Sequence, residues 1–302
     1  MLLFPRLCAL AILAALPPSA SLAEPFKTVF PEIHAQLPTE LLPGVDGLDL
    51  KSGTFTLDGG MAQVTVPDDY YFLDAADARY VLEALWENPE APTMLGMIFP
   101  RKYTPFDQAS WAITLEFDPI GYVSDEDAAG YDYDELLQTM KDDTISENEW
   151  RVQNGFEKIE LLGWAAEPHY DQAERKLYWA KKLHFDGAPE DTLNYNIRAL
   201  GRKGVLVMNF IANADQLAEV EAAVPGALRM ISFTEGNRYA DYVPGVDTLA
   251  AVGIGGLIAG KVLASKAGFL VLLLAFAKKG FVLILLPLIW LKNKLFARKP
   301  TV

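Results

Sequence analysis

Four strand-like segments follow one another between residues 158 and 211, separated by turns. In the second segment, Leu177, Trp179, Leu183 and Phe185 share one face, which is the two-residue period of a half-buried strand. Consecutive strands joined by short turns pair antiparallel. The chain must therefore fold around an antiparallel sheet. The predicted strands are 158–165, 176–185, 192–200 and 204–211.

Helical patterns separate this block from further strands, which predicts an α+β fold: an antiparallel sheet with packed helices, plus a C-terminal transmembrane helix. The other predicted strands are 54–57 and 62–66, joined by an Asp58-Gly59-Gly60 turn, and 94–99 and 111–117. The first predicted helix is 74–86, capped by Asp74 and with Tyr80, Val81, Leu82 and Leu85 spaced for a buried face. The second is 135–154, in one piece or two and closed by Gly155, and the third starts at Asn213 and is interrupted or restarted at Pro225-Gly226.

The C-terminal part of the chain has the composition of a membrane anchor. The apolar stretch 267–291 is long enough to span a bilayer. Lys278 and Lys279 near its centre cost about 5–7 kcal/mol on the insertion scale, which the apolar residues offset. No acidic residue follows Asp247, whereas residues 24–245 carry 39 acidic and 17 basic residues, a net charge of −22. We expect one crossing, with the acidic domain outside and the basic tail in the cytoplasm.

The N-terminus resembles a secretory signal peptide. Arg6 precedes a short apolar run, and Ser21 and Ala23 are the small residues of a cleavage site. The alternative is an uncleaved N-terminal anchor. Cleavage after Ala23 would remove Cys8, the only cysteine, so the mature protein would have no disulfide. These features predict a single-pass protein of the bacterial cytoplasmic (inner) membrane, with its large domain in the periplasm.

The chain therefore divides into six predicted parts. They are a signal peptide (1–23), an arm leading into the domain (24–53), an exported acidic α+β domain (54–245), a Gly-rich membrane-proximal segment (246–266), a transmembrane helix (267–291) and a basic cytoplasmic tail (292–302). Gly256 and Gly260 have the GxxxG spacing at which helices approach closely, so they are candidates for homo-oligomer contact. The alternative is that they are ordinary small residues of an apolar segment.

The octapeptide WAAEPHYD (164–171) contains the candidate catalytic residues. Glu167, His169 and Asp171 have the side chains of an acid/base cluster. The competing interpretation is structural: Pro168 breaks the strand, Asp171 accepts turn hydrogen bonds, and Tyr170 packs at the sheet edge. We expect the structural role, because the sequence does not identify the partners that a catalytic base needs.

The acidic tract 116–135 contains the candidate cation ligands. Asp125 and Asp127 match two positions of an EF-hand loop, but Ala129 and Leu136 occupy positions that need ligands. The tract therefore predicts at most a weak cation site or a contact with a basic partner, and otherwise a solvated loop. We expect no dedicated metal site and no cofactor. The net charge of −22 also disfavours nucleic acid as a partner.

Two hypotheses of function remain open. The first is a non-enzymatic envelope module that binds another envelope component, because no GxSxG elbow, SxxK motif or zinc-ligand spacing is present. The second is an envelope hydrolase that acts on glycan or cell-wall material through carboxylates. The sequence favours the first.

Several longer motifs carry a family resemblance. They are LLGWAAEPHYD, LYWAKKLHF, LNYNIRALGRKGVLVMNFIA and GNRYADYVPGVDTLAAVGIGGLIAG. Together they resemble an uncharacterised bacterial family of predicted membrane-anchored proteins, over about residues 40–260. This resemblance implies an envelope location and supplies no catalytic residues. The order of elements is also similar to the small α/β/α sandwiches of the PsbP and Mog1 type, which implies a binding or assembly module.

Overall fold

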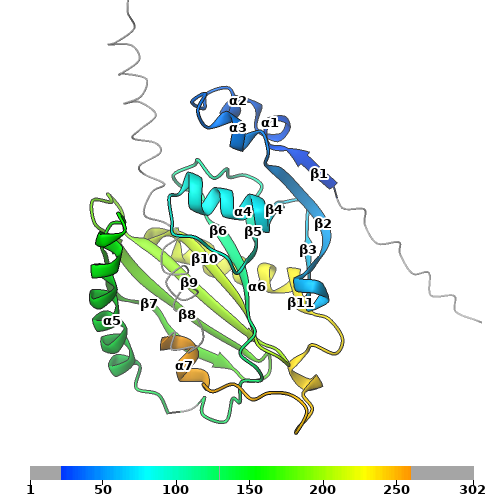
Figure 1. The fold of residues 1–302 in the computed structure, drawn as a ribbon, viewed down its shortest axis with the longest axis vertical. Helices are drawn as coiled ribbons and strands as arrows, with labels where there is room; N and C mark the ends of the chain where they lie inside the picture. The colour runs from blue at the N-terminus through cyan, green and yellow to red at the C-terminus, as the bar shows by residue number, and fades with distance from the viewer. Residues whose placement is uncertain (1–21, 129, 260–302) are drawn as a thin grey trace, which may run out of the picture.

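The computed structural model describes residues 22–128 and 130–259 (Figure 1). Its strands are β1 (Leu22–Pro25), β2 (Asp49–Leu57), β3 (Ala62–Val66), β4 (Tyr70–Asp74), β5 (Met94–Pro100), β6 (Ala112–Asp118), β7 (Ile159–Asp171), β8 (Lys176–Phe185), β9 (Thr192–Leu200), β10 (Val205–Asn213) and β11 (Ile231–Phe233). They form one sheet in the order β11-β3-β2-β4-β5-β6-β10-β9-β8-β7, with β1 beside β2. Neighbouring strands pair antiparallel, so the predicted α+β class with an antiparallel sheet is confirmed.

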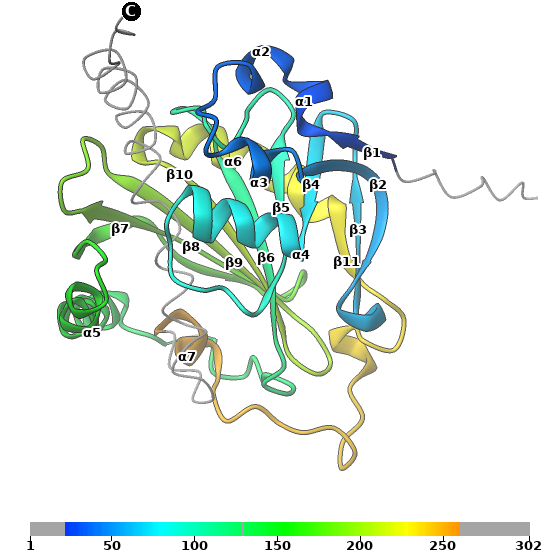
Figure 2. The ribbon, with the colours of Figure 1, turned by 45° about the horizontal axis from the view of Figure 1, so that its top comes forward.

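Helices cover both faces of this sheet. They are α1 (Phe26–Val29), α2 (Pro31–His34), α3 (Leu42–Val45), α4 (Ala75–Arg79), α5 (Tyr133–Gln153), α6 (Leu217–Met230) and α7 (Ile254–Ala259). Helices α4, α5 and α7 lie on one face, and α6 lies on the other (Figures 1 and 2). The three apolar clusters follow this layering, since one lies under α6, one under α4 and one under α5 and α7.

The predicted hairpin forms at the expected turn. Leu57 pairs with Ala62 across the Asp58-Gly59-Gly60 turn, in which both glycines have positive φ. Strand β2 starts at Asp49, five residues before the predicted start, because its first residues pair with β1. The arm 24–53 thus consists of β1, three short helices and the start of β2, and it buries Phe26 against the domain.

The helix predicted from Asp74 is present, with a change of helical type. The Asp74 carboxylate accepts hydrogen bonds from the N–H groups of Ala76 and Asp77, at 3.0 and 3.2 Å. Helix α4 then continues as a π-helix from Tyr80 to Leu85. Of the four residues predicted on its buried face, Val81, Leu82 and Leu85 lie in the core, whereas Tyr80 is half-buried.

Two helices are more continuous than the sequence suggested. The α5 helix runs unbroken from Tyr133 to Gln153, and Gly155 follows its C-terminus with a φ of 83°. The α6 helix passes through Pro225, so the predicted interruption there was wrong. The packing of Val224 and Ala227 against the sheet holds the helix together across the proline.

The predicted membrane-related segments fall largely outside the described residues. This applies to the signal peptide except for Leu22 and Ala23, to the transmembrane helix 267–291 and to the basic tail 292–302. Within residues 22–128 and 130–259, no helix is both long enough and apolar enough to cross a membrane. The start of the segment 246–266 is described, and there α7 buries Ile254, Leu257 and Ile258 in the core beneath α5.

Candidate functional site

The octapeptide 164–171 lies inside β7, the strand at one edge of the sheet. The prediction that the strand ends near Trp164 and turns at Pro168 was wrong, because β7 continues to Asp171. A proline is tolerated on an edge strand, where its missing N–H need not pair. Three shifts of register between Leu161 and His169 accommodate it, as bulges commonly do at sheet edges.

The three candidate catalytic residues have separate surroundings. Glu167 and His169 are exposed, and the His169 ring stacks with Tyr178 at 6.4 Å between centroids. The Asp171 carboxylate accepts hydrogen bonds from the N–H groups of Ala173 and Glu174, at 2.9 and 3.0 Å, so it closes the β7–β8 turn. Within the described chain, no hydrogen bond joins His169 to either carboxylate.

Tyr170 instead connects β7 to the acidic tract. Its hydroxyl donates a hydrogen bond to Asp125, at 2.8 Å, and the hydroxyl of Tyr239 donates to the other oxygen of that carboxylate, at 3.0 Å. The Arg175 guanidinium forms an ion pair with the same group. Burial would raise the pKa of Asp125, but the two tyrosine hydrogen bonds outweigh it, so the pKa lies below its usual value.

A stack of rings adjoins this carboxylate. Tyr122 lies between Tyr242, at 3.9 Å, and Tyr239, at 4.4 Å between ring centroids. The guanidinium of Arg175 lies over the other face of Tyr239, at 4.9 Å. Arg175 has a φ of 54°, an unusual conformation for a residue with a side chain, and it ends the turn after β7. Arg175 therefore adopts a backbone conformation that favours glycine, while its guanidinium pairs with Asp125 and lies over the Tyr239 ring.

Asp127 contacts a different part of the same C-terminal segment. Its carboxylate accepts a hydrogen bond from the N–H of Ile254, at 3.2 Å, and another from the Tyr131 hydroxyl. A Cβ at Gly253 would lie 1.9 Å from this carboxylate, and a Cβ at Gly255 would lie 2.0 Å from the Tyr131 ring. Only glycine therefore allows the segment to come this close. We call residues 234–259 the linker, because they lead from the sheet to α7.

Further contacts fix the linker between these two points. The guanidinium of Arg202 donates to Asp247, at 2.8 Å. Leu249 pairs with Tyr122, whose N–H donates to Thr248 and whose carbonyl accepts from Ala250, both at 2.8 Å. The candidate cation ligands Asp125 and Asp127 therefore bind this chain's own residues. Within the described residues, no group of three or more His, Asp or Glu side chains could hold a metal ion.

A cleft of about 680 Å³ opens beside the ring stack. Its polar residues include Arg175, Lys176 and Arg238, and the linker contributes Tyr239 and Tyr242 to its wall. Side chains of β10, α6 and β11 provide the apolar part, namely Leu206, Met208, Leu228, Ile231 and Phe233.

A second polar site, which the sequence analysis did not anticipate, lies on the face of the sheet that carries α4 and α5. We call it the polar sheet face: Thr114, Glu116, Trp179, Lys181, Asn194, Asn196, Arg198 and Asn209. Strand register places one member from each of four strands in a row, Trp179–Asn196–Asn209–Thr114. Each of the eight is at most 6% exposed. Charged and amide groups are therefore collected in the interior, where burial is costly without partners.

Two polar atoms of this face lack hydrogen-bond partners among the described residues. They are the indole N–H of Trp179 and one carboxylate oxygen of Glu116. The Lys181 side chain is also buried, and the charge of Glu147 acts on it. The other Glu116 oxygen accepts from the Thr93 hydroxyl, at 2.6 Å. The Arg198 guanidinium lies 4.9 Å from the Trp179 ring centroid. Unpaired buried polar atoms are rare in native proteins, so each needs an explanation, and a bound water, ion or ligand is one.

Burial shifts two of these groups toward neutrality. It raises the pKa of Glu116 to about 7, and it lowers the pKa of Lys181 to about 7 with the help of the positive charge of Arg198. Perturbed values of this kind cluster at functional sites. Both residues can thus exchange a proton near neutral pH, and both can donate a hydrogen bond when protonated.

The sequence indicates the strand that carries this face, but not that its polar side is buried. Asn194, Asn196 and Arg198 alternate with apolar residues, the pattern of a strand with one wet face. In the structure every residue of β9 is buried, on both faces. The alternation identifies the strand correctly, but covering the polar side depends on elements distant in sequence.

Comparisons with known proteins give the family and several distantly similar solved structures. No curated protein matches this chain significantly. Among solved structures, a cyanobacterial PsbP (CyanoP) from Synechocystis sp. PCC 6803 is 10% identical, with a TM-score of 0.33 over 60% of this chain and 91% of that chain. The Ran-binding protein Mog1p of Saccharomyces cerevisiae is 14% identical, with a TM-score of 0.30 over 61% and 95%. A point mutant of protein Mog1 is 15% identical, with a TM-score of 0.30 over 59% and 94%.

At these TM-scores the similarities stand as comparisons alone, and the looser resemblance to PsbP and Mog1 stays a prediction. The expected membership of an uncharacterised family is confirmed, whereas membrane anchoring stays a prediction. A family model described as "Protein of unknown function (DUF2167)" matches residues 49–289, which is most of the chain, and the chain therefore belongs to the DUF2167 family.

Proposed function

We propose that this protein is a membrane-anchored binding module of the cell envelope, with its domain on the periplasmic side and the polar sheet face as its ligand site. The observation that carries the proposal is the pair of buried polar atoms without partners among the described residues of that face, the indole N–H of Trp179 and one carboxylate oxygen of Glu116, beside the buried Lys181. A folded domain does not keep such groups inside without a benefit, because each costs about 1–3 kcal/mol when unsatisfied.

The missing partner is best supplied by an oxyanion. The indole N–H of Trp179 has no acceptor among the described residues, and Lys181 offers a buried ammonium. Glu116 can act as a further donor once protonated, since its pKa is near 7. Positive and donor groups facing inward in a low-dielectric site favour a carboxylate or phosphate group over a neutral solute.

The membrane anchor supports the proposal from the sequence. The apolar stretch 267–291 follows the linker by a few residues, and the acidic domain and the basic tail differ in charge as the two sides of a membrane protein do. The linker is held to the sheet at Asp125, Asp127 and Asp247. An anchor attached at Ala259 would therefore present the domain to the envelope in a fixed orientation.

The test uses the full chain in detergent and two neighbouring lysines. Lys181→Met removes the buried ammonium, whereas Lys182→Met removes a half-exposed ammonium that pairs with Asp191. Succinate, inorganic phosphate and neutral maltose serve as probes in a thermal-shift assay. Succinate or phosphate is expected to raise the melting temperature of the wild type and of Lys182→Met, but not of Lys181→Met. An equal shift in all three proteins, or no shift with either anion, would contradict the proposal.

A second candidate function is an envelope hydrolase that acts on glycan or cell-wall material, and one observation favours it. Glu116 is 1% exposed and has a pKa near 7, which suits a general acid or base at neutral pH. The test measures release of soluble products from peptidoglycan. Activity that disappears in Glu116→Gln and persists in His169→Ala and Asp171→Asn would assign the reaction to this face. Loss in the latter two would assign it to β7.

A further inference from the structure

The middle of the linker carries an unusual concentration of exposed apolar side chains. Val243, Val246 and Leu249 are 41%, 74% and 60% exposed, and they lie within seven residues. Only four other large apolar side chains in the described part of the chain are comparably exposed, and they are Leu22, Ile145, Trp150 and Val152. We call residues 243–249 the apolar loop.

The loop is held rigidly in this arrangement. The Asp247 carboxylate accepts the N–H of Val243, at 2.7 Å, and the Val243 carbonyl accepts the N–H groups of Val246 and Asp247, at 3.1 and 3.0 Å. The side chain of Asp247 is only 5% exposed and is paired with Arg202. The charged residue of the loop, Asp247, therefore points inward, while Val243, Val246 and Leu249 point outward. This is the reverse of an ordinary surface turn, in which apolar groups are turned inward.

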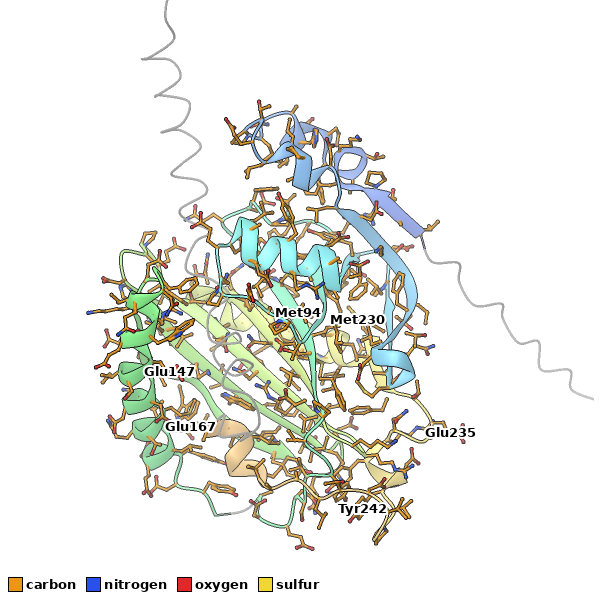
Figure 3. The ribbon with its side chains drawn as sticks, viewed as in Figure 1. Met94, Glu147, Glu167, Met230, Glu235 and Tyr242 are labelled. Carbon is orange, nitrogen blue, oxygen red and sulfur yellow. The ribbon has the colours of Figure 1, made fainter. Side chains whose placement is uncertain are left out.

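Neighbouring residues suit contact with a lipid surface. Tyr242 precedes the loop, and its ring stacks on Tyr122 while lying at the lower edge of the molecule (Figure 3). Arg202, Lys203 and Arg238 come together near the loop, since Arg202 donates its N–H to Asn237 and Gly201 pairs with Arg238. A tyrosine, exposed valines and leucine, and nearby cations are the side chains that partition into the membrane interface.

The distance along the chain from α7 to the predicted transmembrane stretch is short, so an anchored domain would lie close to the bilayer. The predicted transmembrane stretch starts at residue 267, eight residues after Ala259, and an extended chain of that length spans roughly 25–30 Å. The loop that leads to α7 projects beyond the sheet (Figure 2). A domain anchored in this way can lay the loop on the membrane surface without unfolding the linker.

We propose that the apolar loop is a second membrane contact, with Val243, Val246 and Leu249 inserted at the interface of the bilayer and Tyr242 at the level of the headgroups. This contact goes beyond the anchor, because it fixes which side of the domain faces the lipid. It also places the nearby cleft, with Arg175 and Arg238, at the membrane surface.

The test uses the full chain with Cys8→Ser in vesicles of phosphatidylethanolamine and phosphatidylglycerol. Single cysteines at Val246→Cys and, as a control, Val152→Cys, which is 52% exposed on α5, carry an environment-sensitive fluorophore. The label at 246 is expected to shift to the blue, to be quenched by nitroxide lipids, and to be quenched several-fold less by aqueous iodide than the label at 152.

Three results overturn the proposal. If the chain sediments with the vesicles while both labels respond equally to iodide, the anchor stands and the loop contact is wrong. If the chain does not sediment with the vesicles, both the anchor and the loop contact are wrong. If oxidation joins two chains efficiently through the cysteine at 246 in unlabelled protein, the loop instead contacts a second copy of this chain.

Discussion

The carboxylate of Asp127 accepts a hydrogen bond from the backbone N–H of Ile254, at 3.2 Å, so a residue of the acidic tract caps a helix that begins 127 positions later. The first turn of a helix leaves its N–H groups without intrahelical partners, and a carboxylate there satisfies one of them and opposes the helix dipole. This contact and the close approach of Gly253 and Gly255 join α7 to the domain.

Replacing Gly255 by Val should therefore detach α7. A Cβ at this position would lie 2.0 Å from the Tyr131 ring, so the helix must shift, at a cost of roughly 1–3 kcal/mol for overpacking. Limited proteolysis of the full chain should show faster cleavage between residues 243 and 259. Gly163→Ala is the control, since a Cβ there meets nothing within 4 Å. Equal cleavage of both variants would show that the tight contact does not hold the helix.

Asp125→Asn should loosen the ring stack. The substitution removes the charge that pairs with Arg175 and leaves two tyrosine hydroxyls with a weaker acceptor, a loss of about 1–3 kcal/mol. Urea denaturation of the full chain measures the change, with Glu167→Gln on the exposed edge of β7 as the control. Because the pKa of Asp125 is lowered in the folded protein, its contribution is present above the ordinary value of 3.8 and is lost as the pH falls below it. If acidification lowered the free energy of unfolding of the wild type and of Asp125→Asn by the same amount, this assignment would be wrong.

Stability should pass through a minimum near pH 7 because of the polar sheet face. Glu116 holds its proton more tightly when folded, with a pKa near 7 against 4.5, so its contribution falls as the pH rises from 4.5 to 7. Lys181 holds its proton less tightly when folded, with a pKa near 7 against 10.5, so stability recovers as the pH rises above 7. Glu116→Gln should remove only the fall in unfolding free energy between pH 4.5 and 7. Lys181→Met should remove only the rise above pH 7. Unfolding free energies measured from pH 4.5 to 10 would show a monotonic curve if either assignment were wrong.

Asn148→Leu should promote self-association through the edge strand. The Asn148 amide donates to the carbonyl of Ile159 and accepts its N–H, both at 2.8 Å, so it occupies pairing groups at the start of β7. Without it, this edge can pair with another chain. Light scattering of concentrated protein should rise for Asn148→Leu and stay at the wild-type level for Ser146→Ala, whose hydroxyl donates within α5. Equal scattering would mean that the edge is protected by other means, such as the bulges of β7.

The elements that rest on local patterns could be predicted from the sequence. The Asp58-Gly59-Gly60 turn, the Asp74 cap and the alternation in β8 are each determined by neighbouring residues, and all three form as expected. The effect of Pro168 could not be predicted in this way, because it depends on the position of β7 in the sheet. A central strand would have ended at this proline, whereas the edge strand β7 continues through it.

The functional features depend on long-range contacts, which a single sequence does not display. Asp125 and Asp127 were recognised as notable, but as cation ligands, because their true partners Tyr239 and Ile254 lie more than a hundred residues away. The polar side of β9 has the alternation of a solvent-facing strand, but Asn196 and Arg198 are buried because of the fold as a whole.

The attachment of the linker also determines how the domain responds to force. Three hydrogen bonds hold the linker at positions that are close together in the sequence. Arg202 donates to Asp247, the N–H of Tyr122 donates to Thr248, and the N–H of Ile254 donates to Asp127. Tension applied at Ala259 would load this group of bonds before it reached any strand of the sheet. The linker would thus detach from the domain first. This would lengthen the connection to the anchor, while the domain and its polar sheet face stay folded.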